Sequence, residues 1–171
     1  PFWSNFIRTP ELAIALMDEW EGKIEALAQS TINEPVTSIS GVPTWTLVLL
    51  KRILEISGKK NIKEVWPDFE LYIHGGVSFT PYKEQFEKII GPGCKYLEIY
   101  NASEGFFAAQ DNIEEEGMLL FLHHGIFYEF MTIEEYGKPH PKTIGLDKVE
   151  IGKNYAIVIS TNGGLWRYLV G

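Results

Sequence analysis

The sequence predicts an α/β fold in which a parallel β-α-β unit with helices is followed by a mostly antiparallel β part. Between residues 71 and 100, an apolar run, an amphipathic run and a second apolar run follow one another, the order that joins parallel strands. After residue 117, short apolar runs separated by glycine-containing turns are typical of antiparallel strands. We therefore expect an α/β part over about residues 1–110 and an antiparallel β part over about residues 117–171.

Composition narrows the class of protein. The 171 residues are 45% hydrophobic and 22% charged, which excludes a disordered or collagen-like polymer. The formal charge is -8, so the chain lacks the basic field that draws nucleic acid or an anionic membrane surface. The apolar runs are far shorter than the roughly 20 residues that cross a bilayer. The single cysteine, Cys94, cannot form an internal disulfide, and we expect a reducing, cytoplasmic setting.

Helix signals dominate the first half of the chain. Thr9-Pro10 is typical of a helix start, with Thr as N-cap and Pro at the first helical position. The apolar residues that follow are spaced like one face of a helix: Leu12, Leu16, Trp20, Ile24 and Leu27. A second helix is predicted from Pro43 to Ser57, with Gly58 as its stop. A third is predicted to open at Thr80-Pro81 and to end before Gly91.

Three strands are predicted among these helices. Val36 to Ile39 is a short β-branched run, and Leu71 to His74 is an apolar run that ends at Gly75-Gly76. Lys95 to Tyr100 follows the third helix. The last two runs are the strands of the predicted parallel unit.

Four more strands are predicted in the second half. Met118 to Leu122 and Ile126 to Thr132 are expected to pair around Gly125. Tyr155 to Ser160 and Leu165 to Val170 flank Asn162-Gly163-Gly164, and a glycine-rich turn between two such runs indicates a β-hairpin. This part is therefore expected to be antiparallel.

Three segments carry side chains or backbone suited to a ligand. Gly75-Gly76 follows a strand, where backbone without side chains lets a ring or phosphate approach, although a plain turn explains a glycine pair more often than a ligand does. The segment from Tyr100 to Gly105 places an aromatic ring, a hydroxyl and a carboxylate at the carboxyl end of a parallel strand, where open α/β sheets bind ligands. A polar turn with a solvated Glu104 is the alternative. Arg167 stands between two aromatic residues, where it could also stack on either at a sheet edge.

Other reactive side chains give weaker signals. His123 and His124 are adjacent, and neighbouring strand residues face opposite sides of a sheet, so they are not expected to share a metal ion. Neither has a second ligand at the spacing of a zinc site. Cys94 has no histidine nearby in sequence, and an inert thiol is expected.

Five segments together resemble one protein family. They are Ile39-Ser40-Gly41-Val42-Pro43-Thr44-Trp45, His74-Gly75-Gly76, Tyr100-Asn101-Ala102-Ser103-Glu104-Gly105, Phe127-Tyr128-Glu129-Phe130 and Gly164-Leu165-Trp166-Arg167-Tyr168-Leu169-Val170-Gly171. Their order and rough spacing resemble the acyl acid amido synthetases, the auxin-responsive family of plants with bacterial relatives, within the adenylate-forming superfamily. The resemblance extends from about residue 36 to the end of the chain, and it implies a bacterial member of the family.

The resemblance implies an activity and its partners. It implies a piece of the large N-terminal domain of an adenylate-forming enzyme. That enzyme would use ATP and Mg²⁺ to adenylate a small carboxylic acid, and would pass the acyl group to the amine of an amino acid. Two alternatives stay open: a ligase that hands the acyl group to coenzyme A, and a non-catalytic nucleotide-binding or interaction domain.

The resemblance also implies roles for single residues. Glu104 and Ser103 would be catalytic, with Glu104 holding Mg²⁺ and Ser103 approaching the α-phosphate. The residues implied in nucleotide binding are Tyr100, Gly75, Gly76, Ala102 and Tyr168. The residues implied in binding the acyl acid are Phe106, Phe107, Ala108 and Tyr128.

Three parts of the family pattern are not found in these 171 residues. They are the Ser/Thr/Gly-rich phosphate loop, the aspartate that would follow Gly171, and the C-terminal lid domain. We therefore expect an excised piece that is inactive by itself.

Overall fold

The computed structural model describes residues 7–170 and divides into two compact units. The first unit comprises the residues up to Tyr100 together with Ala108–Leu119. The second comprises Asn101–Phe107 and the residues from Leu120 on. Gly171, the last residue of the final family-like segment, lies outside the described residues.

The longest helix of the first unit, α4, spans Pro43–Ser57 as the sequence predicts. Pro43 lies in its first turn, where a backbone N–H has no acceptor within the helix, so the lack of an N–H in proline costs no hydrogen bond. Gly58 ends it with a left-handed φ of 64°, and the Gly58 N–H donates to the carbonyl of Leu54. Local signals suffice here because both ends are set by residues with special backbone chemistry.

The single helix expected after Thr9-Pro10 is wrong. The chain forms two helices instead, α2 over Leu12–Ala15 and α3 over Trp20–Thr31. Glu19 precedes α3 as its N-cap, and its carboxylate accepts from the backbone N–H groups of Glu21 and Gly22. A side chain that satisfies the first amides of a helix starts a new helix at that point, although the apolar spacing continues through it.

Two shorter helices complete the first unit. Helix α5 spans Ile62–Val65, with Asn61 as its N-cap, and was not predicted. Helix α6 spans Lys83–Ile90. It begins two residues beyond the predicted Thr80-Pro81 start, because a turn in which the Tyr82 N–H donates to the Phe79 carbonyl comes first.

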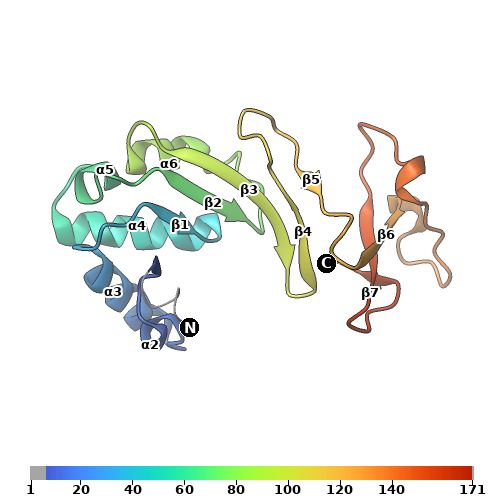
Figure 1. Cartoon of the computed structure of the whole chain (residues 1–171), viewed down its shortest axis with the longest axis horizontal. Coiled ribbons are helices and arrows are strands. Elements are labelled where there is room, and N and C mark those ends of the chain that lie inside the picture. Colours follow the sequence, from blue (N-terminus) through green and yellow to red (C-terminus); the bar gives the residue numbers. More distant parts are fainter. Residues whose placement is uncertain (1–6, 171) are drawn as a thin grey trace. The chain divides into compact units, whose positions relative to one another are not determined.

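A parallel sheet is the backbone of the first unit (Figure 1). Strands β1 (Ser38–Ser40), β2 (Leu71–Gly75) and β3 (Lys95–Ala102) are parallel neighbours, with Ile39 opposite Tyr72 and Tyr72 opposite Tyr96. The five-stranded sheet continues in the order β1-β2-β3-β4-β5, with β4 over Gly105–Ala109 and β5 over Leu119–Leu120. Strand β4 was not predicted.

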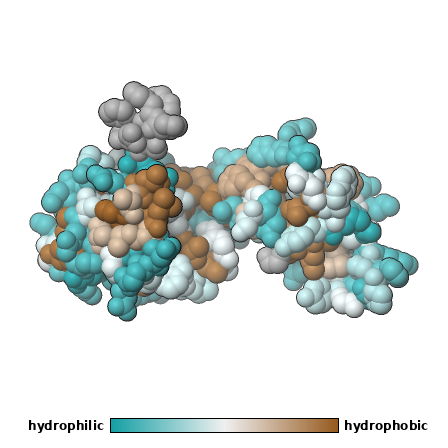
Figure 2. Space-filling view, turned by 90° about the horizontal axis from the view of Figure 1, so that it is seen from below, coloured by the Kyte–Doolittle hydropathy of each residue, from teal (hydrophilic) through white to brown (hydrophobic). Residues whose placement is uncertain are grey.

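The core of the first unit joins α4, α5 and α6 to the face of β2 that carries Tyr72. The Tyr72 ring stacks on Phe86 of α6 with centroids 4.5 Å apart, and its hydroxyl donates to the carbonyl of Gly41. The larger buried apolar side chains of this core are Leu47, Leu50, Ile53, Ile62, Trp66, Phe69, Tyr72, Phe79, Phe86 and Ile90. Trp45 of α4 is exposed. Figure 2 shows apolar side chains lying among hydrophilic ones at the surface.

The second unit is built on a separate antiparallel sheet of strands β6 (Ile126–Met131), β7 (Ala156–Thr161) and β8 (Tyr168–Leu169). The hairpin predicted around the glycine turn is confirmed as β7–β8. Two 3₁₀ turns, Ile133–Glu135 and Leu146–Lys148, lie between β6 and β7.

The predicted pairing of Met118–Leu122 with Ile126–Thr132 is wrong. Strand β5 belongs to the five-stranded sheet, whereas β6 pairs with β7. Strand partners depend on packing between distant segments, so a prediction from nearness in sequence gave the wrong partner strand. The fold class itself is confirmed: a mostly parallel sheet with helices and a separate antiparallel sheet. Within residues 7–170, no helix combines the length and apolar character that a membrane span needs.

Candidate functional site

The segment that resembles the family most specifically forms a turn at the carboxyl end of a parallel strand. Tyr100, Asn101 and Ala102 end β3, and Ser103 and Glu104 connect it to β4. This is the end of a parallel strand at which open α/β sheets present ligand-binding side chains. Local sequence therefore located the turn correctly, and a ligand there stays a prediction.

Glu104 is held by a residue far along the chain within the second unit. The Tyr168 hydroxyl of β8 donates to Glu104 Oε1 at 2.9 Å, across 64 positions of sequence. This hydrogen bond and the charge of the nearby carboxylate raise the pKa of Tyr168, because a phenolate would face the Glu104 anion. The structure thus brings together two of the residues that the sequence singled out separately.

Beside Tyr168, Arg167 binds polar groups of the same unit. Its Nε donates to Glu129 Oε2 at 3.2 Å, and its Nη2 donates to Thr143 Oγ1 at 3.0 Å. These hydrogen bonds hold the guanidinium, whereas the alternative from the sequence was stacking of Arg167 on Trp166 or Tyr168. Glu129 lies in one of the five family-like segments but was given no role, and Thr143 carried no signal that would have found it.

In the first unit, the predicted glycines end strand β2. A Cβ at Gly75 would run into the backbone oxygen of Ile99, its register partner on β3, so close packing of the two strands already requires glycine there. Gly76 has a φ of 81°, a left-handed conformation that favours glycine. Tyr100 lies near the carboxyl end of the neighbouring strand. Both glycines have a structural reason, and their role at a nucleotide stays a prediction.

His74, next to this pair, is a buried titratable group. It is 4% exposed, and its ring stacks on Phe79 with centroids 3.9 Å apart. Its Nδ1 is buried with no hydrogen-bond partner among residues 7–170. Burial lowers the pKa of His74 to about 4, so the imidazole is neutral at pH 7.

The residues predicted to line an acyl-acid pocket differ in exposure. Phe106 is 41% exposed and lies 5.3 Å from the ring of Phe121. Phe107, Ala108 and Tyr128 are buried, and the rings of Phe107 and Tyr128 meet edge to face. Phe107 and Tyr128 therefore help to pack the second unit, and their contact with an acyl acid stays a prediction.

Glu104 is the predicted ligand of Mg²⁺, and its surroundings bear on that role. Within the described part of the chain, no three His, Cys, Asp or Glu residues gather as a metal cluster. Mg²⁺ commonly takes one or two protein carboxylates and completes its shell with phosphate oxygens and water. The single carboxylate of Glu104, in a turn at the sheet end, fits that donor set. His123 and His124 are exposed in a turn before β6, not in a strand as expected, and His124 lies against Phe121.

Comparison with known families identifies the family to which the chain belongs. The chain matches the GH3 family N-terminal domain over residues 1–94 and the GH3 family central domain over residues 119–171. The chain belongs to the GH3 family. The family inferred from the five segments is thereby confirmed.

Similar proteins support the same assignment. The chain is 30% identical over 116 residues to a jasmonoyl–L-amino acid synthetase, JAR4, of Nicotiana attenuata, a match that covers 64% of the chain and 20% of the relative. It is 22% identical over 177 residues to the indole-3-acetic acid-amido synthetase GH3.3 of Arabidopsis thaliana, covering 91% of the chain and 29% of the relative. The chain therefore spans less than a third of either relative's length.

A solved structure shares the fold. The structure of the GH3.15 acyl acid amido synthetase superposes with a TM-score of 0.72 over 98% of the chain and 39% of its own length, at 16% identity. At that identity the likeness shows the fold alone, and it agrees with the predicted α/β fold class.

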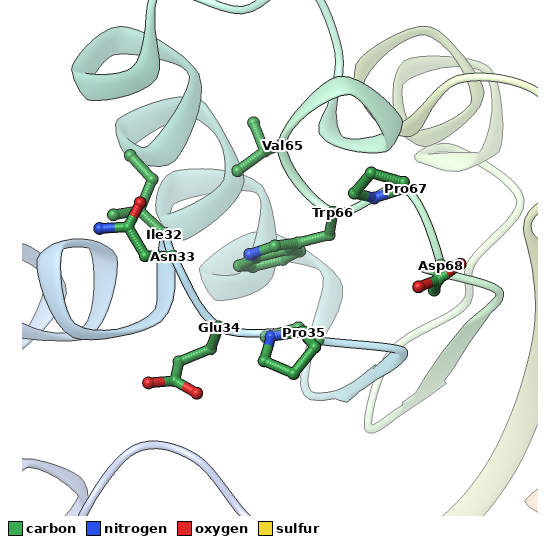
Figure 3. Close-up of a pocket in the computed structure, with 9 residues that line it drawn as sticks. Ile32, Asn33, Glu34, Pro35, Val65, Trp66, Pro67 and Asp68 are labelled. Carbon is green, nitrogen blue, oxygen red and sulfur yellow. The ribbon is translucent and has the colours of Figure 1, made fainter.

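Two cavities of this GH3 chain are described by the residues that line them. One of about 370 Å³ in the first unit is lined by residues after α3 and around Trp66 (Figure 3). The Trp66 Nε1 donates to the Thr31 carbonyl. Another of about 380 Å³ in the second unit borders Phe127 and Trp166. Neither cavity includes a residue predicted to bind nucleotide or metal.

Proposed function

We propose that this chain is part of an ATP-dependent ligase that joins a carboxylic acid to the amine of an amino acid through an acyl-adenylate. The basis is GH3 family membership across two domains, with relatives that are acid–amino acid synthetases. The observation in the structure that carries the proposal is the hydrogen bond between Tyr168 and Glu104, because it joins the two most specific family segments within one unit. A cytoplasmic location is part of the proposal.

The proposed reaction has two balanced steps. A carboxylate oxygen of the acid attacks the α-phosphorus of ATP, and pyrophosphate leaves with the electrons of the broken P–O bond. The amine of the amino acid then attacks the acyl carbon, loses a proton, and AMP leaves. Both steps place negative charge on phosphate oxygens, which preorganised donors and cations stabilise.

The chain's own residues would serve the first step. Glu104 would hold Mg²⁺, which supplies positive charge to the phosphate oxygens when bound. The Ser103 hydroxyl, beside it in the turn, would donate to the α-phosphate. Tyr100 would lie against the adenine ring, with Gly75 and Gly76 at its border. Phe106, exposed on β4, is the best placed of the predicted acyl-acid residues to contact a ligand.

Acid-dependent exchange of labelled pyrophosphate into ATP tests adenylation, since that step is reversible. The longest protein that carries this sequence is assayed with a broad panel of aromatic and aliphatic acids. We expect exchange with at least one acid and none without acid. If no acid on the panel supports exchange while ATP still binds, the protein is a nucleotide-binding domain and the proposal is wrong.

The acceptor is tested with the acid that supports exchange. Each amino acid, and separately coenzyme A, is added, and the product is identified by mass spectrometry. We expect an amide with an amino acid. A thioester with coenzyme A in the absence of any amide would replace the proposed ligase by its acyl-CoA-forming counterpart.

A further inference from the structure

The residue next to Tyr168 has an unusual backbone. Among residues 7–170, Arg167 is the only non-glycine with a positive φ, at 47°. A side chain in this left-handed region costs about 1–2 kcal/mol, and such residues persist only where surrounding contacts hold them. The contacts that hold Arg167 in this conformation therefore show which neighbouring groups the conformation serves.

Three side chains of the second unit form a closed set of hydrogen bonds, which we call the Arg167 clamp: Glu129, Thr143 and Arg167. Glu129 uses both carboxylate oxygens, Oε1 for the Thr143 hydroxyl at 2.5 Å and Oε2 for the Arg167 Nε at 3.2 Å. Arg167 Nη2 completes the set by donating to Thr143 Oγ1 at 3.0 Å. The Arg167 backbone N–H donates separately to Ser160 Oγ of β7.

The clamp is anchored to rigid elements. Glu129 lies in β6, where its side chain is only 18% exposed. Thr143 precedes Ile144, which exchanges two backbone hydrogen bonds of 2.9 Å with Phe130 of β6. By contrast, a pair of exposed side chains such as Lys153–Glu150 contributes little. The clamp therefore fixes the backbone at Arg167 and the direction in which the next residue leaves it.

That next residue is Tyr168, whose hydroxyl reaches Glu104. We infer that the Arg167 clamp is a positioning device that holds the Tyr168 hydroxyl on Glu104, making Glu129, Thr143 and Arg167 positioning residues for the Glu104 carboxylate. Without the clamp, residue 167 relaxes to a negative φ, the following peptide turns, and Glu104 loses its hydroxyl donor. The catalytic consequence rests on the proposed function; the geometric one does not.

The geometric claim is tested by NMR on the chain labelled with ¹³Cζ-tyrosine, at one pH and without ATP. Tyr168→Phe assigns the Tyr168 signal. Glu129→Gln and Arg167→Gly are expected to move that signal towards the position of an exposed tyrosine such as Tyr136, because the phenol loses its carboxylate acceptor. Arg167→Gly keeps the left-handed backbone accessible, so a change in this variant shows that the side-chain bonds matter.

Two further variants keep this test decisive. Thr143→Val removes one hydroxyl at nearly constant shape, so we expect it to fold even if Glu129→Gln or Arg167→Gly does not. It is expected to shift the Tyr168 signal less than those variants, but in the same direction. Lys153→Met, which breaks the exposed Lys153–Glu150 surface pair of the same unit, is the matched control and should leave the signal in place. An unchanged Tyr168 signal in Glu129→Gln, Arg167→Gly and Thr143→Val overturns the clamp.

The catalytic consequence is tested by pyrophosphate exchange in the longest protein that carries the sequence. Loss of a group that orients a metal ligand commonly costs about 10- to 100-fold in metal affinity or activity, so we expect the clamp variants to need about 10-fold more Mg²⁺ for half-maximal rate. The KM for the acid should change little. An unchanged Mg²⁺ requirement with a shifted NMR signal limits the clamp to structure and overturns its catalytic role. Absence of pyrophosphate exchange in the wild type overturns the proposed function. The NMR experiment then still tests the geometric role of the clamp, because it needs no enzymatic activity.

Discussion

Buried His74 should make the first unit acid-sensitive. The perturbation is a fall in pH from 7 to 4, applied to the wild type and to His74→Phe. The ring is 4% exposed, stacks on Phe79, and has a buried Nδ1 with no partner among the described residues. Protonating it in the folded chain would bury a charge, whereas the unfolded chain takes up the proton freely.

The size of the effect follows from the two pKa values. The imidazole has a pKa near 6.5 in the unfolded chain and of about 4 in the folded one. A depressed histidine pKa gives a stability contribution that is full above the unfolded value and is lost as the pH falls towards the folded value. The free energy of unfolding should therefore drop by about 2 kcal/mol at pH 5 and about 3 kcal/mol at pH 4 from this group alone.

The assay is urea denaturation followed by tryptophan fluorescence, with Trp66 buried in the same core as the reporter. His74→Phe keeps an aromatic ring against Phe79 and removes the titrating nitrogen, and His74→Leu serves if the larger ring is not accommodated. Exposed His140 is the matched control, and His140→Gln should keep the wild-type slope. Carboxylates titrating at low pH are present in every variant, so the difference between variants isolates His74.

Two results would refute this reasoning. One is a wild type and a His74→Phe variant that lose stability in parallel between pH 7 and pH 4. The other is a His74 ring signal in NMR that titrates with a midpoint above 6. Either shows that the imidazole has water or a partner at Nδ1 and is not held neutral by burial.

Two other substitutions test the site and its surroundings. Glu104→Gln should lower acid-dependent pyrophosphate exchange about 10²- to 10³-fold with an unchanged urea midpoint, because the amide keeps the shape and loses the charge; an unchanged rate and Mg²⁺ dependence would make Glu104 a bystander. Gly76→Ala should cost about 1 kcal/mol of unfolding free energy, since φ is left-handed but its Cβ would meet Val42 at an ordinary 3.5 Å. Gly75→Ala should cost more, because its Cβ would collide with the backbone of Ile99; equal urea midpoints for the two alanine variants would contradict this.

The sequence predicted best where one or two residues decide a local structure. Proline at the start and glycine at the end set the bounds of α4, and the turn with Gly163-Gly164 identified the β7–β8 hairpin. Backbone chemistry of this kind acts within a few residues, so it can be read without knowing the rest of the chain. The family segments were likewise readable, because each is a short run of fixed residue types.

Predictions failed where a local signal competed with another contact. The apolar spacing through Trp20 indicated one helix, but the Glu19 carboxylate caps a new one. The nearness of Leu119–Leu120 and Ile126–Met131 indicated a strand pair, but the two strands belong to different sheets. In the first case the decisive group was a polar cap, and in the second it was β7, a strand far along the chain.

By itself, the sequence determined the fold class, the family, and the turn that carries Ser103 and Glu104. Only the tertiary structure decided that Tyr168 meets Glu104 across 64 positions, and that Arg167 is held by Glu129 and Thr143. Directional hydrogen bonds between distant residues depend on the register of whole strands, since a slip of one residue turns each side chain to the other face. No local pattern encodes that register, because it is set by the packing of the sheet.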